Sequence, residues 1–281
     1  MIQNYFETID FTESPNLDGG LRRRGLFKND SKEKPLITVI TVVLNNEQYI
    51  EESIKSLHQQ KYDNYEHIII DGCSTDKTLE IIKKYDSKID YWSSKKDRGI
   101  YDAFNQGMKL AKGRYIGFLN SDDIFFSKYT LNYVIESFKK NKDIDFIFGP
   151  VKKHWALLHG YKPWKIYFTW GFYTSHSTGF FIKNSSAKIL GDYNLKYKFS
   201  SDYDYFFRMI VKKKMKGIGV PKEKIFGVFR RGGFSSSVKF LDHFKEEITI
   251  RNDNNQNKVL ILLIIIYKSI RHLKKIIKEI I

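Results

Sequence analysis

The feature that most constrains the fold is a regular alternation of strand-type and helix-type segments between residues 36 and 149. Residues 36–44, "LITVITVVL", form a continuous apolar and β-branched run, the pattern of a strand buried on both faces. Residues 47–60 follow with apolar side chains three and four positions apart, which is typical of a helix. The pattern repeats with strand-like segments at 65–71, 89–94, 114–120 and 143–149 and helix-like segments at 74–85, 99–113 and 127–141. This order predicts an α/β fold: a doubly wound, mostly parallel, Rossmann-like sheet with helices on both faces.

Length and composition agree with a folded chain of that class. The 281 residues suffice for one large α/β domain or one domain with an appendage. Hydrophobic residues make up 42% and aromatic residues 16%, so the chain can fill a core and is not disordered throughout. Cys73 is its one cysteine, which excludes an internal disulfide framework and fits a reducing cytoplasm.

The formal net charge of +16 predicts an anionic partner. Nucleic acid, an acidic membrane surface and a phosphorylated substrate all qualify, and a solvated basic surface on a Lys-rich chain is the simpler alternative. The N-terminus lacks the basic start and apolar centre of a secretory signal. The longest unbroken apolar run, Val259–Tyr267, is shorter than the roughly 20 residues that cross a bilayer, so it does not span one alone.

Acidic residues stand where two of the predicted strands end. Asp71 closes the 65–71 segment, and Asp122 and Asp123 directly follow the 114–120 segment. Ligands of such sheets bind at the carboxyl ends of the strands, so we expect these acids on one rim. Two adjacent carboxylates repel each other unless a cation or hydrogen bonds intervene, and Mg²⁺ or Mn²⁺ takes oxygen ligands while keeping water and phosphate in its shell. The pair therefore indicates a divalent-metal site for a nucleotide diphosphate, or else a turn whose acids cap a helix.

Two further segments contain polar residues that suit the same rim. Asp71 is able to accept hydrogen bonds from a nucleobase or ribose, or only from the backbone of its own loop. Ser74 stands where the N-cap of the next helix belongs. The segment "KKDRGIYDAFNQG" places Asp97, Asp102 and Asn105 around a helix start, where they serve either a ligand or helix capping.

Four blocks together resemble a known family. They are "ITVITVVLNNEQYIEESIKSLHQQ", "EHIIIDGCSTDKTLEII", "DRGIYDAFNQGMKLAKGRYIGFLNSDD" and "SSDYDYFFRM", in this order and at familiar spacings. The chain resembles a family 2 glycosyltransferase with the GT-A fold, of the kind that builds bacterial surface polysaccharides, from about Gly19 to about Ser237. The resemblance implies an inverting enzyme that moves a sugar from a nucleotide-diphosphate sugar, with a UDP-sugar favoured, to a hydroxyl of a glycan or lipid-linked acceptor.

The resemblance also implies the catalytic centre. Asp122 and Asp123 would hold Mn²⁺ or Mg²⁺, with Asp123 as the direct ligand. Asp202 would be the catalytic base, although the acid that usually precedes it is replaced by Ser201. An inverting transfer is one displacement at the anomeric carbon, so a base on the acceptor side and a cation on the leaving-group side are the two groups it requires.

The remaining roles implied by the resemblance concern the donor. Asp71 would contact the nucleobase. The other residues that would line or face the donor pocket, or approach the diphosphate, are Asp97, Asp102, Asn105, Asp122, His176, Arg230 and Arg231. Cys73, Lys95 and Lys96 depart from the residues usual in the family, and the identity of the donor sugar stays open.

The domain organisation follows from these assignments. We expect a polar, irregular N-terminal extension over 1–34, a nucleotide-sugar-binding half over 35–150, an acceptor-binding half over 151–240, and a helical tail over 241–281. From residue 257 the tail has six cations and one acid, a formal charge of +5, and its predicted helix has one apolar face. That face comprises Leu263, Ile266, Ile270, Leu273, Ile277 and Ile281.

A basic amphipathic helix of this kind lies on an anionic membrane, and the alternatives are packing on the protein's own core and a homodimer interface. Membrane contact would place the enzyme in the cytoplasm, at the inner face of the cell membrane.

Two other functions share some of these sequence features. A nucleotidyltransferase also uses a doubly wound sheet and an acid pair, but it needs a Gly-rich basic loop after its first strand. Here "NNEQYI" follows that strand. A non-enzymatic nucleic-acid-binding protein would gather basic and exposed aromatic side chains on one surface, whereas this chain concentrates acids at strand ends. We therefore expect no nucleic-acid partner.

Overall fold

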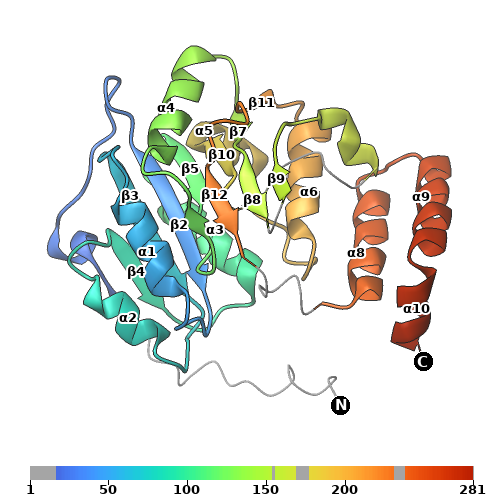
Figure 1. Cartoon of the computed structure of the whole chain (residues 1–281), viewed down its shortest axis with the longest axis horizontal. Helices are drawn as coiled ribbons and strands as arrows, with labels where there is room; N and C mark the ends of the chain where they lie inside the picture. The colour runs from blue at the N-terminus through green and yellow to red at the C-terminus, as the bar shows by residue number, and fades with distance from the viewer. Residues whose placement is uncertain (1–16, 154–155, 169–176, 231–237, 281) are drawn as a thin grey trace.

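An eight-stranded sheet forms the centre of the molecule (Figure 1). The computed structural model describes residues 17–153, 156–168, 177–230 and 238–280. In spatial order the strands are β1 (Leu17–Gly19), β4 (Tyr91–Ser94), β3 (Tyr65–Asp71), β2 (Ile37–Val43), β5 (Tyr115–Phe118), β10 (Phe180–Lys183), β7 (Phe146–Phe148) and β11 (Gly217–Gly219). β4, β3, β2 and β5 run parallel, β11 is parallel to β7, and β1 and β10 are antiparallel to their neighbours. The predicted α/β fold with a mostly parallel sheet is confirmed.

Helices cover both faces of this sheet, because β2 is buried at every position and its side chains point alternately to the two faces. Ile37 and Val39 pack toward one face, and Ile40 and Val42 toward the other, so a strand that is buried at every position needs two helical layers. The first layer contains α1 (Ile50–His58), α2 (Thr78–Lys84) and α4 (Thr130–Lys140). The second contains α3 (Ile100–Leu110), α5 (Asn184–Leu190) and α6 (Ser201–Phe207), which continues as a π-helical turn over Arg208–Lys212.

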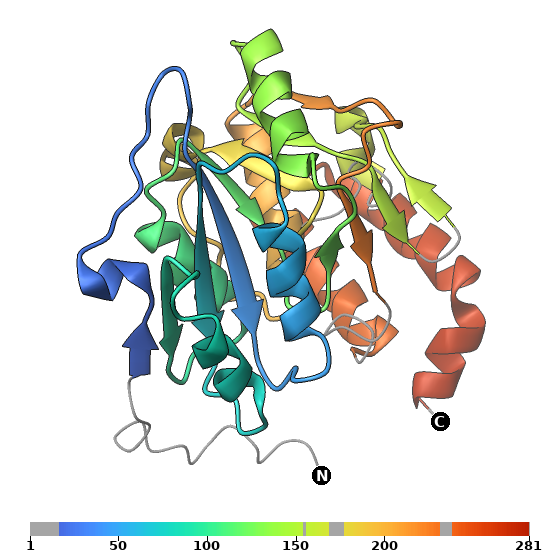
Figure 2. The same cartoon turned by 60° about the vertical axis from the view of Figure 1, so that its left-hand side comes forward.

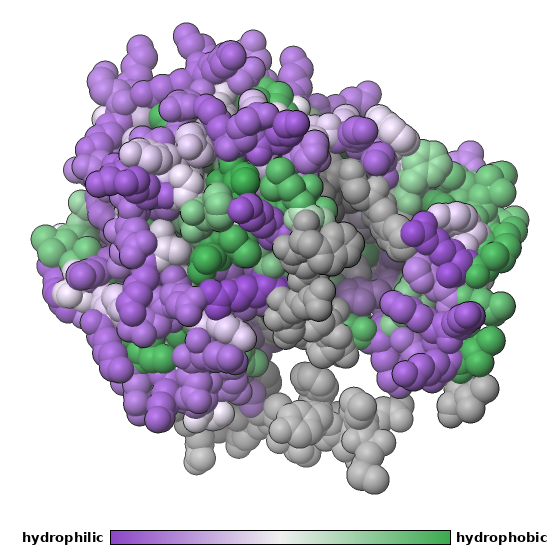
Figure 3. Space-filling view, in the orientation of Figure 1, coloured by the Kyte–Doolittle hydropathy of each residue, from purple (hydrophilic) through white to green (hydrophobic). Residues whose placement is uncertain are grey.

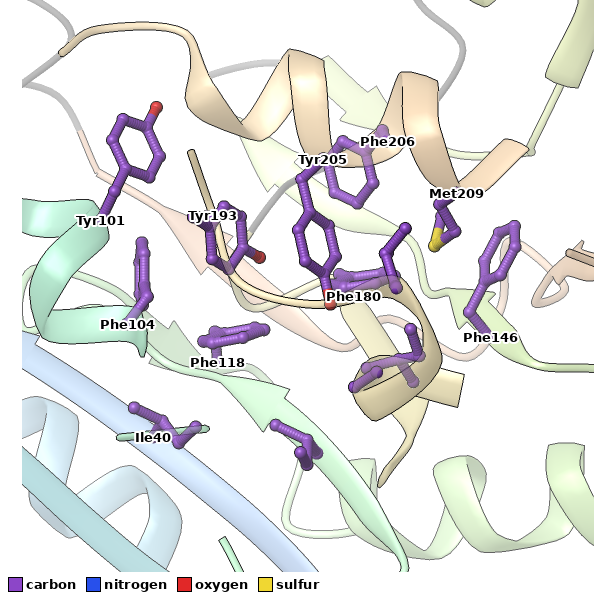
Figure 4. Close-up of a cluster of buried hydrophobic side chains, with 14 of the residues drawn as sticks. Ile40, Tyr101, Phe104, Phe118, Phe146, Phe180, Tyr193, Tyr205, Phe206 and Met209 are labelled. Atoms are coloured by element: carbon purple, nitrogen blue, oxygen red, sulfur yellow. The ribbon is translucent and has the colours of Figure 1, made fainter. Parts of the chain in front are cut away.

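An aromatic cluster joins the second helical layer to the sheet (Figure 4). Phe104 of α3 meets Phe118 of β5 edge to face at 4.9 Å between ring centroids, and Tyr193 stacks on Tyr205 of α6 at 4.1 Å. Gly107 lets α3 approach closely, because a Cβ there would lie 2.4 Å from Ile40 Cγ2. The packing fixes the start of α3 and the start of α6 relative to each other.

A second, four-stranded sheet lies beside the main one and consists of short strands (Figure 2). Its order is β6 (Ile124–Phe125), β12 (Gly227–Phe229), β8 (Val151–Lys153) and β9 (Ala156–Leu158). The pairing of β12 with β6 brings the residues after Phe229 next to those before Ile124.

The prediction of an irregular N-terminal extension is wrong for its described part. Residues Leu17–Gly19 add the edge strand β1 to the sheet, and Leu21–Arg24 form a 3₁₀ helix. Arg22 pairs with Glu66 where both side chains are nearly buried. A carboxylate buried in β3 needs a cation, and the N-terminal segment supplies it, which the periodicity of the segment alone does not reveal.

The position of Ser74 also differs from the prediction. α2 begins at Thr78 rather than after Ser74, and Asp76 Oδ1 accepts a hydrogen bond from Thr78 N at 2.9 Å. Ser74 is not the N-cap, because its hydroxyl donates to Asp71 Oδ1 at 2.5 Å. The serine therefore belongs to the sheet rim.

Three helices complete the chain: α8 (Phe240–Asp253), α9 (Lys258–Arg271) and α10 (Leu273–Ile280). They form a unit at one end of the molecule, with α9 and α10 outermost (Figure 1). Asn257 caps α9 by accepting hydrogen bonds from Val259 N and Leu260 N, and the predicted helical run breaks at His272. Within the described residues, none of the helices has the length and apolar content needed to cross a membrane.

Candidate active site

Asp71 anchors a polar network at the carboxyl ends of the parallel strands. It ends β3, opposite Val43 of β2 and Ser94 of β4, and it is completely buried. Ser94 Oγ and Ser74 Oγ each donate a hydrogen bond to it at 2.5 Å, and Ser74 N adds a longer one. The carboxylate is held by its own loops, which fixes its place on the rim as the sequence predicted.

Hydrogen bonds continue from Asp71 toward β5. Ser74 Oγ accepts from Asn45 N at 2.8 Å, just after β2, and the neighbouring Asn46 donates its side-chain amide to Ser121 Oγ at 2.8 Å. Ser121 directly precedes the acid pair. The loops after β3, β2 and β5 therefore form one connected rim.

The acid pair occupies a tight turn at the end of β5. Asp123 N donates to Asn120 O at 3.0 Å, which closes the turn, and Asp123 is completely buried whereas Asp122 is partly exposed. Burial, reinforced by the charge of Asp122, raises the pKa of Asp123 to about 8, although a 2.5 Å hydrogen bond from Ser177 Oγ opposes the shift. Burial also raises the pKa of Asp122.

The residues around this turn fit a divalent cation held mainly by non-protein ligands. Both carboxyls sit where ionisation is unfavourable without a positive partner, and the buried Asn120 Oδ1 has no hydrogen-bond partner among the described residues. Nowhere in the described part of the chain do three His, Cys, Asp or Glu side chains cluster as a metal site. Mg²⁺ and Mn²⁺ are commonly bound by one or two carboxylates plus water and substrate phosphates, so two acids suffice here.

Arg230 lies beside the acid pair. Its backbone N–H donates to Asp123 Oδ1 at 3.4 Å, while its guanidinium pairs with Glu52 and stacks over the Tyr49 ring at 4.7 Å. Its positive charge lowers the pKa of Asp122 against the larger effect of burial. The predicted neighbour Arg231 lies outside the described residues.

Asp97 and Asp102 flank the start of α3. Asp97 accepts a hydrogen bond from Gly99 N at 2.8 Å and lies so close to Gly72 that a Cβ on that glycine would be 3.0 Å from its Oδ2. Burial, with a smaller contribution from Asp102 and Asp71, raises the pKa of Asp97 to about 6. Asp102 is buried less, and hydrogen bonds from Arg98 outweigh that burial and lower its pKa.

Asn105 lies on the inner side of α3. Its side-chain amide donates to Tyr193 O at 2.9 Å, and its Oδ1 accepts from Tyr193 N at 2.8 Å. The nitrogen and the oxygen of this amide therefore both hold α3 against the segment before α6. A contact between Asn105 and the donor stays a prediction. His176 lies outside the described residues.

Asp202 stands in the first turn of α6 and contacts the start of α3. Tyr101 Oη lies 3.2 Å from Asp202 Oδ1 and 3.1 Å from Phe199 O, and Tyr203 N donates to the same carboxylate oxygen at 2.9 Å. Figure 4 shows Tyr101 at the edge of the aromatic cluster with its hydroxyl directed away from Phe104. Asp202 is partly exposed and so remains accessible to a substrate.

The other acid in this turn has a different environment. Asp204 is buried and accepts hydrogen bonds from Arg208 Nε at 2.8 Å and Asn254 Nδ2 at 2.9 Å. These contacts join α6 to the π-helical turn and to the end of α8. Of the two acids, Asp204 has a structural position and Asp202 an accessible one.

The model of the family described as "Glycosyl transferase family 2" matches residues 38–206. This segment contains the connected rim, the acid pair, the start of α3 and Asp202. The chain belongs to glycosyl transferase family 2. It is therefore a transferase enzyme, and the resemblance predicted from its four sequence blocks is confirmed.

Relatives of this glycosyltransferase occur in several different organisms. It is 27% identical over 226 residues to the uncharacterized glycosyltransferase Rv1514c of Mycobacterium tuberculosis, covering 71% of this chain and 83% of the relative. It is 40% identical over 93 residues to the putative teichuronic acid biosynthesis glycosyltransferase TuaG of Bacillus subtilis, covering 32% of this chain and 37% of that one. The family includes proteins of polysaccharide biosynthesis.

Solved structures confirm the GT-A fold of this glycosyltransferase. The structure of S. aureus TarS 1-349 in complex with UDP-GlcNAc superposes with a TM-score of 0.61 at 21% identity, covering 85% of this chain and 72% of that chain. The mannosyltransferase PcManGT from Pyrobaculum calidifontis, in complex with GDP-Man and Mn²⁺, gives 0.60 at 15% identity, covering 90% and 75%.

Sequence reasoning missed three residues of the glycosyltransferase site: Ser94, Tyr101 and Ser177. Ser94 and Ser177 donate to Asp71 and Asp123, and Tyr101 contacts Asp202. Ser177 lies next to the predicted His176, and Tyr101 lies within the quoted "DRGIYDAFNQG" block, so position in a motif was the one available signal. Their partners are 23 to 101 residues away along the chain, beyond the reach of local patterns.

Proposed function

We propose that this glycosyltransferase moves a sugar, with inversion, from a nucleotide-diphosphate sugar to a hydroxyl of a glycan or lipid-linked acceptor in bacterial surface-polysaccharide synthesis. One observation carries the proposal: an acid pair with one fully buried member and a separate, accessible acid occupy two different places in the fold. Asp122 and Asp123 follow β5, and Asp202 begins α6 and contacts the start of α3. A single displacement at an anomeric carbon needs such a pair of sites, one for the leaving group and one for the nucleophile.

Asp202 is the proposed general base. Its carboxylate takes the proton of the acceptor hydroxyl while that oxygen forms a bond to the anomeric carbon. The bond between the anomeric carbon and the diphosphate oxygen breaks, and the electron pair leaves with the nucleotide diphosphate. Tyr101 and the backbone N–H of Tyr203 orient the carboxylate by hydrogen bonding to Oδ1.

Asp123 and Asp122 would hold Mn²⁺ or Mg²⁺, with Asp123 as the direct ligand. Such a cation, when bound, neutralises the charge that develops on the departing diphosphate. Arg230 adds a fixed positive charge beside the pair, since its side chain is anchored on Glu52 and Tyr49. Metal-bound and nucleotide-bound relatives of the same fold support this arrangement.

The donor lies, in this proposal, along the loops that follow β3 and β4. Asp71 contacts the nucleobase, and the segment from Asp97 to Asn105 lines the pocket, with His176 and Arg231 facing the donor from the second half. A UDP-sugar is favoured, which the UDP-GlcNAc complex of TarS supports. The proposed site of action is the cytoplasmic face of the cell membrane, where lipid-linked acceptors are available.

A thermal-shift screen tests donor binding. The protein is heated with UDP-, GDP- and dTDP-sugars, each with and without Mn²⁺, and a ligand that binds the native state raises the melting temperature. We expect a Mn²⁺-dependent shift with a UDP-sugar. The proposal fails if none of the sugar nucleotides shifts the transition and none is hydrolysed.

Asp202→Asn tests the assignment of the base. Asparagine keeps the shape and the hydrogen bond from Tyr101 but does not accept the proton, so turnover falls by roughly 10²- to 10⁴-fold while the donor-induced thermal shift is retained. Asp192→Asn is the matched control, because Asp192 forms an exposed pair with Lys109 and lies outside the proposed site. A fully active Asp202→Asn variant contradicts the assignment.

A further inference from the structure

The inner sides of α9 and α10 contact α8. Glu247 of α8 pairs with Lys268 of α9, and both side chains are nearly buried. Glu279 near the end of α10 accepts hydrogen bonds from Phe240 N at 2.9 Å and Leu241 N at 3.0 Å, at the start of α8. These contacts fix one side of α9 and α10 to α8 and determine which side faces outward.

The outward side is apolar. Six aliphatic side chains along it are between 47% and 73% exposed: Leu262, Leu263, Ile266, Ile270, Leu273 and Ile277. We call this set the C-terminal apolar face. On the inner side of α9, by contrast, Ile261 and Ile264 are only 4% and 6% exposed. Figure 3 shows hydrophobic residues gathered along the right-hand edge of the molecule, over α9 and α10.

Because α9 is apolar on both sides and α8 covers only one of them, its outer side is a candidate surface for a second partner. Soluble proteins rarely expose apolar patches of more than a few hundred Å², and larger ones usually mark interaction sites. Five of the six exposed aliphatic positions in this face agree with the face predicted from sequence, and the sixth, Leu262, lies beside them. The predicted Ile281 lies outside the described residues.

Cations border this face. Arg271, Lys274, Lys275 and Lys278 are exposed around α10, and Glu279 is the one acid of α9 and α10. Because Glu279 is directed toward the start of α8, its charge is turned away from the outer side. The face is therefore aliphatic in the middle and positive along its border, which is the charge pattern that complements an anionic lipid surface.

Exposed aromatic residues extend the face beyond α9. The 3₁₀ helix η2 (Pro163–Phe168) exposes Trp164 by 59% and Phe168 by 55%. Tyr167 O at the end of η2 accepts hydrogen bonds from Arg251 and Gln256, close to the start of α9. Tryptophan is enriched at the boundary between lipid and water, so these rings suit the headgroup region.

We propose that the C-terminal apolar face, together with Trp164 and Phe168, docks flat on an anionic bilayer. The aliphatic side chains enter the boundary between headgroups and acyl chains, and the lysines contact lipid phosphates. A second copy of this chain is the weaker occupant, because residues 257–281 of each copy carry a formal charge of +5 and two such faces repel each other.

The helix α8, which holds α9 and α10, also contacts the segment that precedes the proposed base. Glu246 of α8 accepts hydrogen bonds from Lys198 N at 2.5 Å and Phe199 N at 2.8 Å, and His243 contacts Ser200 Oγ at 3.2 Å. These contacts hold the segment directly before Asp202. Resting on the proposed function, α8 links the helices that dock on the lipid to the segment that carries the base, and the acceptor hydroxyl would come from a lipid of that surface.

Vesicle flotation tests the docking. The full chain is mixed with vesicles of phosphatidylcholine alone, or with about 30% phosphatidylglycerol added. We expect flotation with the anionic vesicles and at least tenfold less binding to the neutral ones. Leu263→Glu/Ile270→Glu abolishes flotation, and Lys274→Glu/Lys275→Glu reduces it by roughly tenfold or more.

The controls match these changes on other helices. Ile189→Glu alters an exposed apolar residue of α5 that is 65% exposed, and Lys139→Glu/Lys140→Glu alters an exposed basic pair in α4. Both control proteins float like the wild type. Wild-type protein that does not float, or Leu263→Glu/Ile270→Glu protein that floats equally well, overturns the proposal, as does a dimer in light scattering that the same double variant converts to a monomer.

Hydrolysis of the sugar nucleotide in solution separates this proposal from the proposed function. The docking variants leave hydrolysis unchanged, because the altered residues lie outside the site. If the wild-type protein floats but hydrolyses no sugar nucleotide, the proposed function fails and the docking surface stands. If hydrolysis is normal and flotation is absent, the reverse holds.

Discussion

The two acidic regions of the candidate active site differ in burial and in the hydrogen bonds that their carboxylates receive. On the sheet rim, Asp123 is completely buried, and burial raises its pKa to about 8. At the start of α6, Asp202 is partly exposed and receives hydrogen bonds from Tyr101 and from its own helix. The first region is unfavourable for an isolated carboxylate, while the second leaves its carboxylate partly open to solvent.

This difference indicates different tasks. A carboxylate that is costly to ionise in isolation gains most when a cation arrives, so the rim suits binding of a metal and a diphosphate. A carboxylate in a milder environment is available to accept a proton from an incoming hydroxyl. The contrast is a hypothesis about function that substitutions on either side are able to break.

Substitution of Asp123 has the largest expected effect. Asp123→Asn removes the proposed direct ligand, so transfer falls by about a thousand-fold or more, which corresponds to about 4 kcal/mol of transition-state stabilisation. The Mn²⁺-dependent part of the donor-induced thermal shift is lost as well. The rim charge is removed without loss of shape, so the protein without metal stays folded.

Asp122→Asn is the matched comparison for this result. It weakens Mn²⁺ binding less than Asp123→Asn does, as measured by Mn²⁺ titration of the thermal shift. If Asp122→Asn abolishes Mn²⁺ binding and Asp123→Asn retains it, the direct ligand is Asp122, the more exposed of the pair. If EDTA does not affect transfer, the proposal that Asp122 and Asp123 hold a required metal is wrong.

Loss of the Tyr101 hydroxyl has a smaller expected effect, on the other side of the comparison. Tyr101→Phe leaves the aromatic cluster intact but removes the group at 3.2 Å from Asp202 Oδ1. We expect kcat to fall roughly tenfold with an unchanged KM for the donor, and stability to fall by about 1 kcal/mol. The readout is the split between kcat and KM, since a purely structural hydroxyl would change stability alone.

The matched control for Tyr101 is Tyr205→Phe in the same aromatic cluster. The Tyr205 hydroxyl is buried and has no hydrogen-bond partner among the described residues, so its removal leaves kcat unchanged. Equal losses of kcat in the two variants would show that the cluster as a whole, rather than the contact with Asp202, matters for turnover.

The sequence predicted the half of the fold that depends on local patterns. The strand β2 was readable because every position along it is apolar or β-branched, and β3 was readable from its run of three isoleucines. The rim acids were readable because they follow such runs. The place of Asp71 followed from topology alone, since the carboxyl ends of parallel strands share one edge.

The other half of the site depends on contacts between distant segments. β10 inserts antiparallel between β5 and β7, and its four residues give no signal of that partner choice. Ser177 reaches Asp123 because β10 begins nearby, 54 residues along the chain. Local periodicity contains no information about such pairings, and the same holds for the salt bridge between Arg22 and Glu66.

Neutralising Asp97 is expected to change stability with pH. The folded pKa of Asp97, about 6, lies above its ordinary value of 3.8, so its contribution to stability is present below that ordinary value and is lost as pH rises through 6. Asp97→Asn stays neutral and retains the hydrogen bond from Gly99 N. The variant therefore melts higher than the wild type at about pH 7.5, and the gap narrows toward about pH 5.

The Asp97→Asn substitution is expected to affect donor binding and stability in opposite directions. If Asp97 lines the donor pocket, Asp97→Asn weakens sugar-nucleotide binding while it stabilises the free protein. Melting curves over the pH range and donor titrations on one preparation give both readouts. A variant that is no more stable than the wild type at either pH removes burial as the cause of the raised pKa.

The smallest expected effect concerns Asp102, whose charge is favoured where that of Asp97 is not. Its pair with Arg98 is an i,i+4 contact on a helix, with the arginine 67% exposed, and such pairs contribute about 0.3–0.5 kcal/mol. Asp102→Asn therefore lowers the melting temperature only slightly. The folded pKa of Asp102 lies below its ordinary value, so the stabilisation by the carboxylate is lost as pH falls through the folded pKa, and the difference between variant and wild type disappears there.

The informative measurement on Asp102→Asn is donor affinity. A residue that lines the pocket weakens sugar-nucleotide binding several-fold when neutralised, whereas a residue that only supports the start of α3 changes stability alone. Arg98→Gln is the control, because it breaks the same ion pair and leaves the carboxylate in place. Weaker donor binding in Asp102→Asn but not in Arg98→Gln assigns the carboxylate to the donor; equal behaviour of the two variants assigns it to the helix.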